Sequence, residues 1–214
     1  MDDRGLYIAA TWAAALLLWT LFRLYYDGLR RPLRAEEVDA FLASLGDRMD
    51  ETGNDAARLR TFLEADDGRE FVMLNLVRTR PGLITDPASG ETLGGAEWLT
   101  RYSRPFVRAL VRRGGHPVFV GRKVGGYVDA WNTPADPGWS LFGAMRYRSR
   151  RDLVRLASDP VFRAAHPAKR LGIETTFSFP SRREFGFHAS PRTTAGLLLA
   201  LLAAFGHIAI LTFG

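Results

Sequence analysis

The chain has 214 residues, a formal net charge of +6 and no cysteine. The lack of cysteine excludes disulfides, thiolate nucleophiles and cysteine-ligated metal centres. A basic balance of this size is typical of proteins that bind nucleic acid or an anionic membrane surface. We favour the membrane, because arginines flank two long apolar segments. Between these segments there is enough chain for one ordinary domain.

Residues 5–26 form the first predicted transmembrane helix. Its central run, 6–22, carries no charge and is long enough to cross a bilayer. The residues before the run are mainly acidic, and four arginines follow it, at positions 23, 30, 31 and 34. A Lys/Arg excess marks the cytoplasmic side, so we expect the N-terminus outside. A cleaved signal peptide is the competing interpretation, but it requires a basic start and a small-residue cleavage site.

Residues 194–214 form the second predicted transmembrane helix. Arginines precede this segment at 182, 183 and 192, and no basic residue follows it. The same rule places the C-terminus outside and the middle domain in the cytoplasm. We therefore predict an integral protein of the bacterial inner membrane with both termini outside. The alternative is a buried C-terminal helix, which a domain this small would have difficulty covering on every side.

Apart from tyrosine, His207 is the one ionisable residue inside the apolar runs 6–22 and 194–214. One interpretation is a neutral imidazole that hydrogen-bonds to the neighbouring helix, at Thr11 or Trp12. The other is a haem ligand or a proton relay. We favour the first, because neither span contains a second histidine or a carboxylate that would complete such a site.

Residues 35–68 are predicted to be a helical lead-in. Val38, Phe41, Leu42 and Leu45 follow the spacing of one helix face. A second short helix is expected over 55–65.

Residues 69–181 are predicted to form an α+β domain. We expect strands at 70–78, 116–124, 139–147 and 174–179. Helices are expected at 96–113 and 149–170, the second one broken near Asp159-Pro160 and before Pro167. The order strand-helix-strand-strand-helix-strand indicates a ferredoxin-like domain, whose four strands lie in the spatial order 4-1-3-2.

In that topology the first strand begins at the end of the sheet where the fourth strand finishes. We therefore expect both membrane tethers to leave from one end of the domain. The loop 79–95 and the turn region 125–137 should meet at the opposite end. Such long loops serve either as binding lids or as solvated connections.

Four segments between residues 71 and 179 resemble the DUF1330 family, within the dimeric α/β-barrel superfamily. They are VMLNLVR at 72–78, RRGG at 112–115 followed by PVFVGR at 117–122, LFGAMRYRSR at 141–150 and SDPVFRAAHPAKRLGI at 158–173. The resemblance implies a ferredoxin-like protomer that pairs sheet to sheet with a second copy. It implies no established reaction, although related barrels include small monooxygenases, lactone isomerases and haem-handling enzymes. The terminal helices and residues 35–65 are departures from the usual family domain.

Five residues of the domain are candidates for a site. Asn75 is a polar residue in an apolar strand, and its amide must bond either to the protein or to a ligand. His116 opens a strand and is either a general base or a partly exposed turn residue. The topology places His116 and His166 at opposite ends, which argues against a two-histidine metal site. Trp98, Tyr102 and Phe106 either pack in the core or line an aromatic ligand pocket.

Four arginines are spaced along one side of the predicted helix 96–113: Arg101, Arg104, Arg108 and Arg112. They form either a solvated face or a contact with acidic lipid or an acidic partner. Nucleic-acid binding is disfavoured, because no aromatic platform is interleaved with them.

The sequence supports two functions. The first is a membrane-tethered dimeric module that binds a small apolar ligand or organises partners at the cytoplasmic membrane face. The second is a cofactor-independent enzyme, of the monooxygenase or isomerase kind, that acts on a small lipophilic or aromatic substrate. We predict no cofactor and no metal, since no Walker loop, dinucleotide fingerprint, catalytic triad or HExxH motif is present. The predicted partners are the lipid bilayer, a second copy of the chain and a small apolar ligand.

Overall fold

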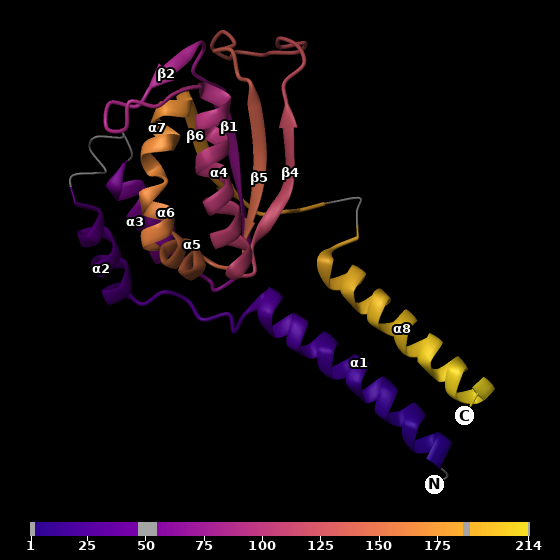
Figure 1. Cartoon of the computed structure of the whole chain (residues 1–214). Coiled ribbons are helices and arrows are strands. Elements are labelled where there is room, and N and C mark those ends of the chain that lie inside the picture. The colour runs from indigo at the N-terminus through magenta and orange to yellow at the C-terminus, as the bar shows by residue number, and fades with distance from the viewer. Residues whose placement is uncertain (1–2, 47–54, 186–188, 214) are drawn as a thin grey trace. The chain divides into compact units, whose positions relative to one another are not determined.

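The computed structural model describes residues 3–46, 55–185 and 189–213 (Figure 1). The chain divides into two compact units. One combines Met1–Leu29 with Glu184–Gly214, and the other is Arg30–Arg183. Each unit is described separately below.

The first unit contains two long helices, α1 (Asp3–Asp27) and α8 (Pro191–Phe213). Both are long and apolar enough to cross a membrane. Their leucines are largely exposed, and the buried residues are Tyr26 in α1 and Ala203 in α8. The predicted spans 5–26 and 194–214 agree with these helices to within three residues at each described end. Residue 214 lies outside the described residues.

The two helices pack against each other through small and polar side chains. Trp12 donates a hydrogen bond from Nε1 to Nδ1 of His207, over 3.5 Å. This contact confirms the prediction that His207 bonds to the neighbouring helix. A Cβ atom added at Gly196 would lie 2.9 Å from Nε1 of Trp19, so the glycine permits close approach. At one end of the pair, the Asp27 carboxylate accepts hydrogen bonds from Arg23 and Arg192, each over 2.5 Å.

The second unit is built on a four-stranded antiparallel sheet, and its class is α+β. The strands are β1 (Phe71–Thr79), β4 (His116–Arg122), β5 (Leu141–Tyr147) and β6 (Ile173–Ser181). Their order across the sheet is β4-β5-β1-β6, which is the order predicted from the sequence. Val72 pairs with Ser181, so β1 begins at the end of the sheet where β6 finishes, as expected.

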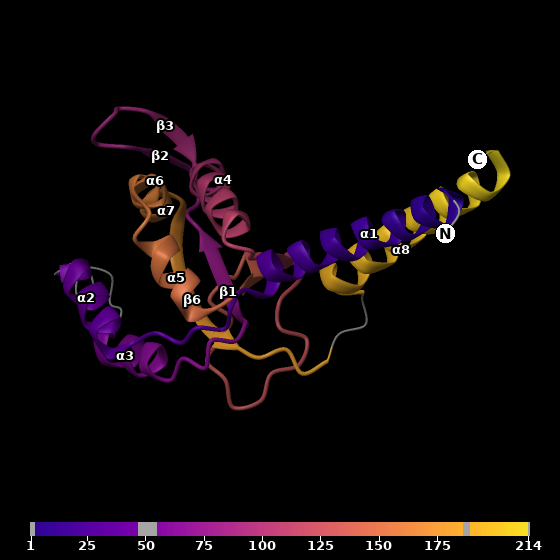
Figure 2. The same cartoon turned by 90° about the horizontal axis from the view of Figure 1, so that it is seen from below.

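Four helices cover one face of this sheet (Figures 1 and 2). They are α4 (Gly95–Arg112), α5 (Arg150–Ala157), α6 (Pro160–Ala164) and α7 (His166–Gly172). The predicted break near Asp159 is confirmed, because the Asp159 side chain caps α6 and Pro160 opens it. The core lies between helices and sheet, where the rings of Phe71 and Tyr147 stack at 5.1 Å beside Leu110 and Leu156.

The lead-in helices α2 (Ala35–Leu45) and α3 (Ala56–Glu64) belong to the same unit. Val38, Phe41 and Leu63 form a second buried cluster, which packs against Val154 and Ala157 of α5. Each fully buried side chain of this kind stabilises the fold by about 1.5–3 kcal/mol.

The predicted loop 79–95 contains a hairpin that sequence patterning did not reveal. Its strands are β2 (Leu83–Thr85) and β3 (Thr92–Gly94), and they pair in antiparallel register. Trp98 of α4 donates from Nε1 to the carbonyl of Ile84 over 3.0 Å, which ties the hairpin to the helix. Strands of three residues are too short to display the alternation from which strands are predicted.

The hairpin and the segment 125–137 follow strand ends at the same edge of the unit. Arg78, at the end of β1, donates from Nη1 to the carbonyl of Pro137 over 2.9 Å. The backbone N–H of Thr79 donates to the Ser140 hydroxyl over 2.9 Å. The predicted meeting of the two connections at one end of the sheet is therefore confirmed.

Candidate functional site

The sheet face that carries no helices is apolar over most of its area, and Arg146 and Ser181, the register partners of Val72, lie at one end of it. Phe71 and Met73 point toward the helices, so the alternate residues of β1 and their register partners point the other way. We call this surface the open sheet face. It consists of Val72, Leu74, Leu76, Phe119, Phe142, Ala144, Phe177 and Phe179.

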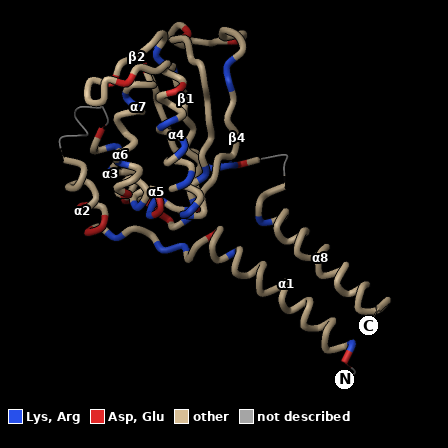
Figure 3. Tube along the Cα trace, viewed as in Figure 1, with Lys and Arg blue, Asp and Glu red and all other residues tan. Residues whose placement is uncertain are grey.

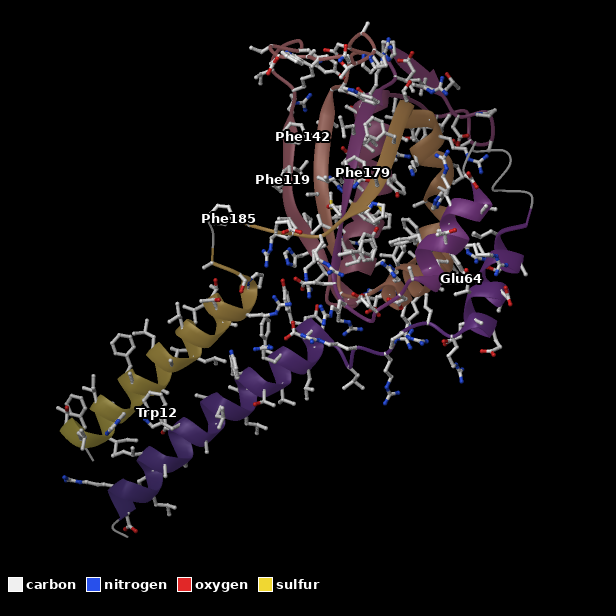
Figure 4. The ribbon with its side chains drawn as sticks, turned by 180° about the vertical axis from the view of Figure 1, so that it is seen from behind. Trp12, Glu64, Phe119, Phe142, Phe179 and Phe185 are labelled. Carbon is white, nitrogen blue, oxygen red and sulfur yellow. The ribbon has the colours of Figure 1, made fainter. Side chains whose placement is uncertain are left out.

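The phenylalanines of the open sheet face are unusually exposed. The exposed fraction lies between 41% and 48% for each of four of them: Phe119, Phe142, Phe177 and Phe179. In Figure 4 three of them lie on strands with no helix of the unit in front. The rings of Phe119 and Phe142 contact each other edge to face at 5.9 Å, and those of Phe177 and Phe179 stack at 6.1 Å. Contiguous exposed apolar surface marks an interaction site more often than scattered apolar residues do.

A groove lies between α4 and the strands β4 and β5, on the helix-bearing side. Its volume is about 490 Å³, which is in the range of small-molecule sites. We call it the α4 groove. Its lining residues are Ala96, Leu99, Thr100, Ser103, Arg104, Val107, Arg108, Arg122 and Leu141.

The α4 groove combines apolar walls with arginine side chains. Leu99 and Val107 contribute from the helix, and Leu141 from the sheet. Arg122 is the register partner of Leu141, so both side chains leave the sheet on the same face. Within the described part of the chain, no carboxylate pairs with Arg104, Arg108 or Arg122.

Basic positions lie along α4 (Figure 3), and the four arginines that the sequence grouped together have different surroundings. Arg101 forms a two-pronged ion pair with Glu91, and its guanidinium lies 5.2 Å from the centre of the Trp98 ring. Arg104 and Arg108 line the α4 groove, whereas Arg112 does not. The predicted surface therefore includes one internally paired arginine and two that face a groove.

Asn75 is bonded within the sheet. Its Nδ2 donates to the carbonyls of Met73 and Gly143, over 3.0 and 3.3 Å, and its Oδ1 accepts from the Ser178 hydroxyl over 2.7 Å. Both amide hydrogens and one acceptor position are thus used by the protein. Asn75 does not line the α4 groove.

The two domain histidines have different neighbours. The Nδ1 of His116 lies 2.8 Å from the carbonyl of Pro117. His166 contacts the rings of Phe162 and Tyr102 edge to face, at 4.8 and 5.8 Å. In the residues that the structure describes, no three His, Cys, Asp or Glu side chains gather as metal ligands would.

Trp98, Tyr102 and Phe106 occupy the interior. Tyr102 and Phe106 stack at 5.9 Å and pack against Phe162. Burial raises the pKa of the Tyr102 hydroxyl, and it lowers the pKa of Lys169, whose ammonium lies 5.6 Å from the Tyr102 ring. None of the three aromatic residues lines the α4 groove.

Among the groove's lining residues, sequence reasoning named only Arg104 and Arg108. The two lining residues from the sheet, Arg122 and Leu141, reach the groove through the pairing of β4 with β5. Residue alternation along 116–124 could have placed Arg122 and Val120 on one face. It could not have placed that face beside α4.

Comparisons with known proteins give a fold likeness and no assigned activity. No protein-family model and no curated protein matches this sequence. RPA0582, a protein of unknown function from Rhodopseudomonas palustris, is 25% identical, with a TM-score of 0.51; the match covers 61% of this chain and 94% of that one. The structure of methylated RPA0582 is 27% identical, with a TM-score of 0.50, and the match covers 59% and 90%.

Proposed function

We propose that this chain is a membrane-tethered, dimeric ligand-binding module. In this proposal α1 and α8 cross the bacterial inner membrane, and the α+β unit is a ferredoxin-like domain of the dimeric α/β-barrel type. Two copies pair through the open sheet face. A small ligand with an apolar body occupies the α4 groove, at the cytoplasmic face of the membrane.

The open sheet face is the observation that carries the proposal. A sheet with one face covered by helices and the other lined by half-exposed phenylalanines leaves apolar surface of its second face in contact with solvent. A second copy would cover that surface with an identical one, as closed twofold dimers do. The likeness of segments 72–78, 141–150 and 158–173 to the DUF1330 family supports the same pairing.

The cofactor-independent enzyme is the alternative function, and the candidate residues support it less well. Asn75 makes three hydrogen bonds inside the sheet, which accounts for its polarity without a substrate. The imidazole of His116 bonds to the carbonyl of Pro117 in its own strand, and His116 is not a lining residue of the groove. Binding is therefore the function that the geometry favours.

The dimer is tested by placing a charge in the open sheet face. The full chain, purified in detergent micelles, should have the mass of two protomers by light scattering after the detergent is subtracted. Phe142→Asp and Phe179→Asp should each yield monomers, because an unpaired carboxylate would be buried in the interface. Val161→Asp is the matched control, since Val161 is 66% exposed on α6, away from the open sheet face. A monomeric wild-type chain would contradict the dimer.

The topology is tested with single cysteines, because the natural chain has none. Asp3→Cys and Phe213→Cys should react with a membrane-impermeant maleimide added outside intact spheroplasts. Ser158→Cys, in the α+β unit, should react only after the membrane is opened. Labelling of Ser158→Cys in intact spheroplasts would overturn the predicted orientation.

A further inference from the structure

We propose that the α4 groove binds a small-molecule acid, with its apolar body against Leu99, Val107 and Leu141 and its carboxylate held by Arg104, Arg108 and Arg122. This inference rests on the proposed ligand-binding function and names the class of ligand. Three observations support it: the hydrogen-bond donors of the groove, the positions of its arginines, and its shape.

Among the described residues that line the groove, only the three guanidinium groups have side-chain hydrogens free to donate to a ligand. The Thr100 hydroxyl donates to the carbonyl of Ala96 over 2.9 Å, and the Ser103 hydroxyl donates to the carbonyl of Leu99 over 2.7 Å. The other lining side chains are aliphatic. A hydrogen-bond acceptor that enters the groove would therefore be served by guanidinium, and a carboxylate matches that planar fork best.

The arginines of the groove repel one another, and a bound anion would offset that repulsion. Arg104 and Arg108 are one helical turn apart, and like charges at that spacing repel each other. Elsewhere in this unit basic side chains are commonly neutralised. Examples are Arg78 with Glu174, Arg101 with Glu91, Arg113 with Asp159, Lys123 with Asp136, Arg146 with Glu70 and Arg151 with Glu37. No such partner serves the groove arginines in the described residues.

The shape of the site favours a small acid over a lipid surface. A flat membrane would attract every arginine on the exposed side of α4, including Arg112. The groove instead combines two arginines of α4 with Arg122 of β4, on either side of apolar walls. Its volume of about 490 Å³ suits a molecule with one or two rings or a short alkyl chain.

The test uses 2-naphthoate and its uncharged analogue 2-naphthamide, titrated calorimetrically into the full chain in lipid nanodiscs, with empty nanodiscs as the blank. We expect 2-naphthoate to bind at least about tenfold more tightly than the amide, because charge-assisted hydrogen bonds exceed neutral ones. Arg104→Gln, Arg108→Gln and Arg122→Gln should each lower the affinity by about tenfold. Arg112→Gln is the matched control and should change it less than twofold.

A second variant separates the groove from the surface charge. Ser103→Trp should fill the groove and abolish 2-naphthoate binding while every arginine remains. Equal affinity for acid and amide, no binding of either, or equal loss in Arg112→Gln and Arg104→Gln would each overturn the inference. Light scattering on the same samples keeps the proposals distinct, since the dimer can persist when the ligand class is wrong.

Discussion

Trp12 of α1 and His207 of α8 are joined by a hydrogen bond from the indole Nε1 to the imidazole Nδ1. The donor is an indole N–H, so Nδ1 must carry no proton and the imidazole is held as the Nε2–H tautomer. The pair thus gives the one histidine of the two apolar helices a protein partner, without a bound haem. It also fixes the facing sides of the two helices, together with Gly196 against Trp19.

The Trp12–His207 bond should contribute measurably to helix packing. We expect a double-mutant cycle of Trp12→Phe and His207→Leu to give a coupling energy of about 0.5–1.5 kcal/mol, similar in size to the energies of hydrogen bonds between apolar helices in membranes. Unfolding in mixed micelles with increasing SDS measures each free energy. Additive effects of the two substitutions would show that the pair makes no net contribution.

Close approach of α4 and α7 depends on glycine. A methyl group at Gly172 would lie 2.6 Å from the backbone nitrogen of Leu99 and 2.7 Å from the carbonyl oxygen of Gly95. Gly172→Ala should therefore lower the free energy of unfolding by about 1–3 kcal/mol, through overpacking. Gly125→Ala is the control, because a methyl group there meets nothing within 4 Å. Denaturant titration compares the two, and similar midpoints would refute the clash.

The stability of the α+β unit should depend on pH, because the Glu37 carboxylate is ion-paired in the fold. Its carboxylate accepts from Arg151 and from the backbone of Arg34, and these bonds lower the pKa of Glu37 to about 2. A carboxyl group whose folded pKa lies below its unfolded value, near 4.5, stabilises the fold above that value. That contribution is lost as the pH falls from about 5 toward 2.

Glu37→Gln should remove this part of the pH dependence. Its effect at neutral pH should be about 1 kcal/mol, because the pair is partly exposed to water. Glu36→Gln is the control, since no ion pair of Glu36 occurs in the described residues. Thermal unfolding between pH 3 and 7 gives the comparison, and parallel curves for wild type and Glu37→Gln would count against the prediction.

The sequence predicted local features well and contacts between distant segments poorly. Helix stripes such as Val38 to Leu45, and the strand order, follow from periodicity and connection rules that act within short stretches. The α4 groove depends on Arg122 of β4 and Leu141 of β5 lying beside α4, which no local pattern encodes. Arg101 was grouped with Arg104 for the same reason, because its partner Glu91 lies on the unrecognised hairpin segment.

Substitution of Asn75 distinguishes a structural role of this residue from a ligand-binding role. Its side chain connects three strands: it lies on β1, donates to Gly143 of β5 and accepts from Ser178 of β6. Asn75→Ala should therefore lower the free energy of unfolding by about 1–3 kcal/mol, since it removes these bonds and leaves their partners unsatisfied. Ser178→Ala removes only one bond and should cost about 0.5–1.5 kcal/mol.

Neither substitution should change 2-naphthoate affinity by more than twofold, because Asn75 and Ser178 do not line the α4 groove. Urea unfolding and calorimetric titration on the same preparations give both quantities. A ligand contact would show the opposite pattern, with affinity lost in Asn75→Ala and stability retained. That result would place the ligand site at Asn75 of the sheet and not in the α4 groove. It would also support the enzyme hypothesis, because an amide that contacts a substrate could orient a reacting carbonyl.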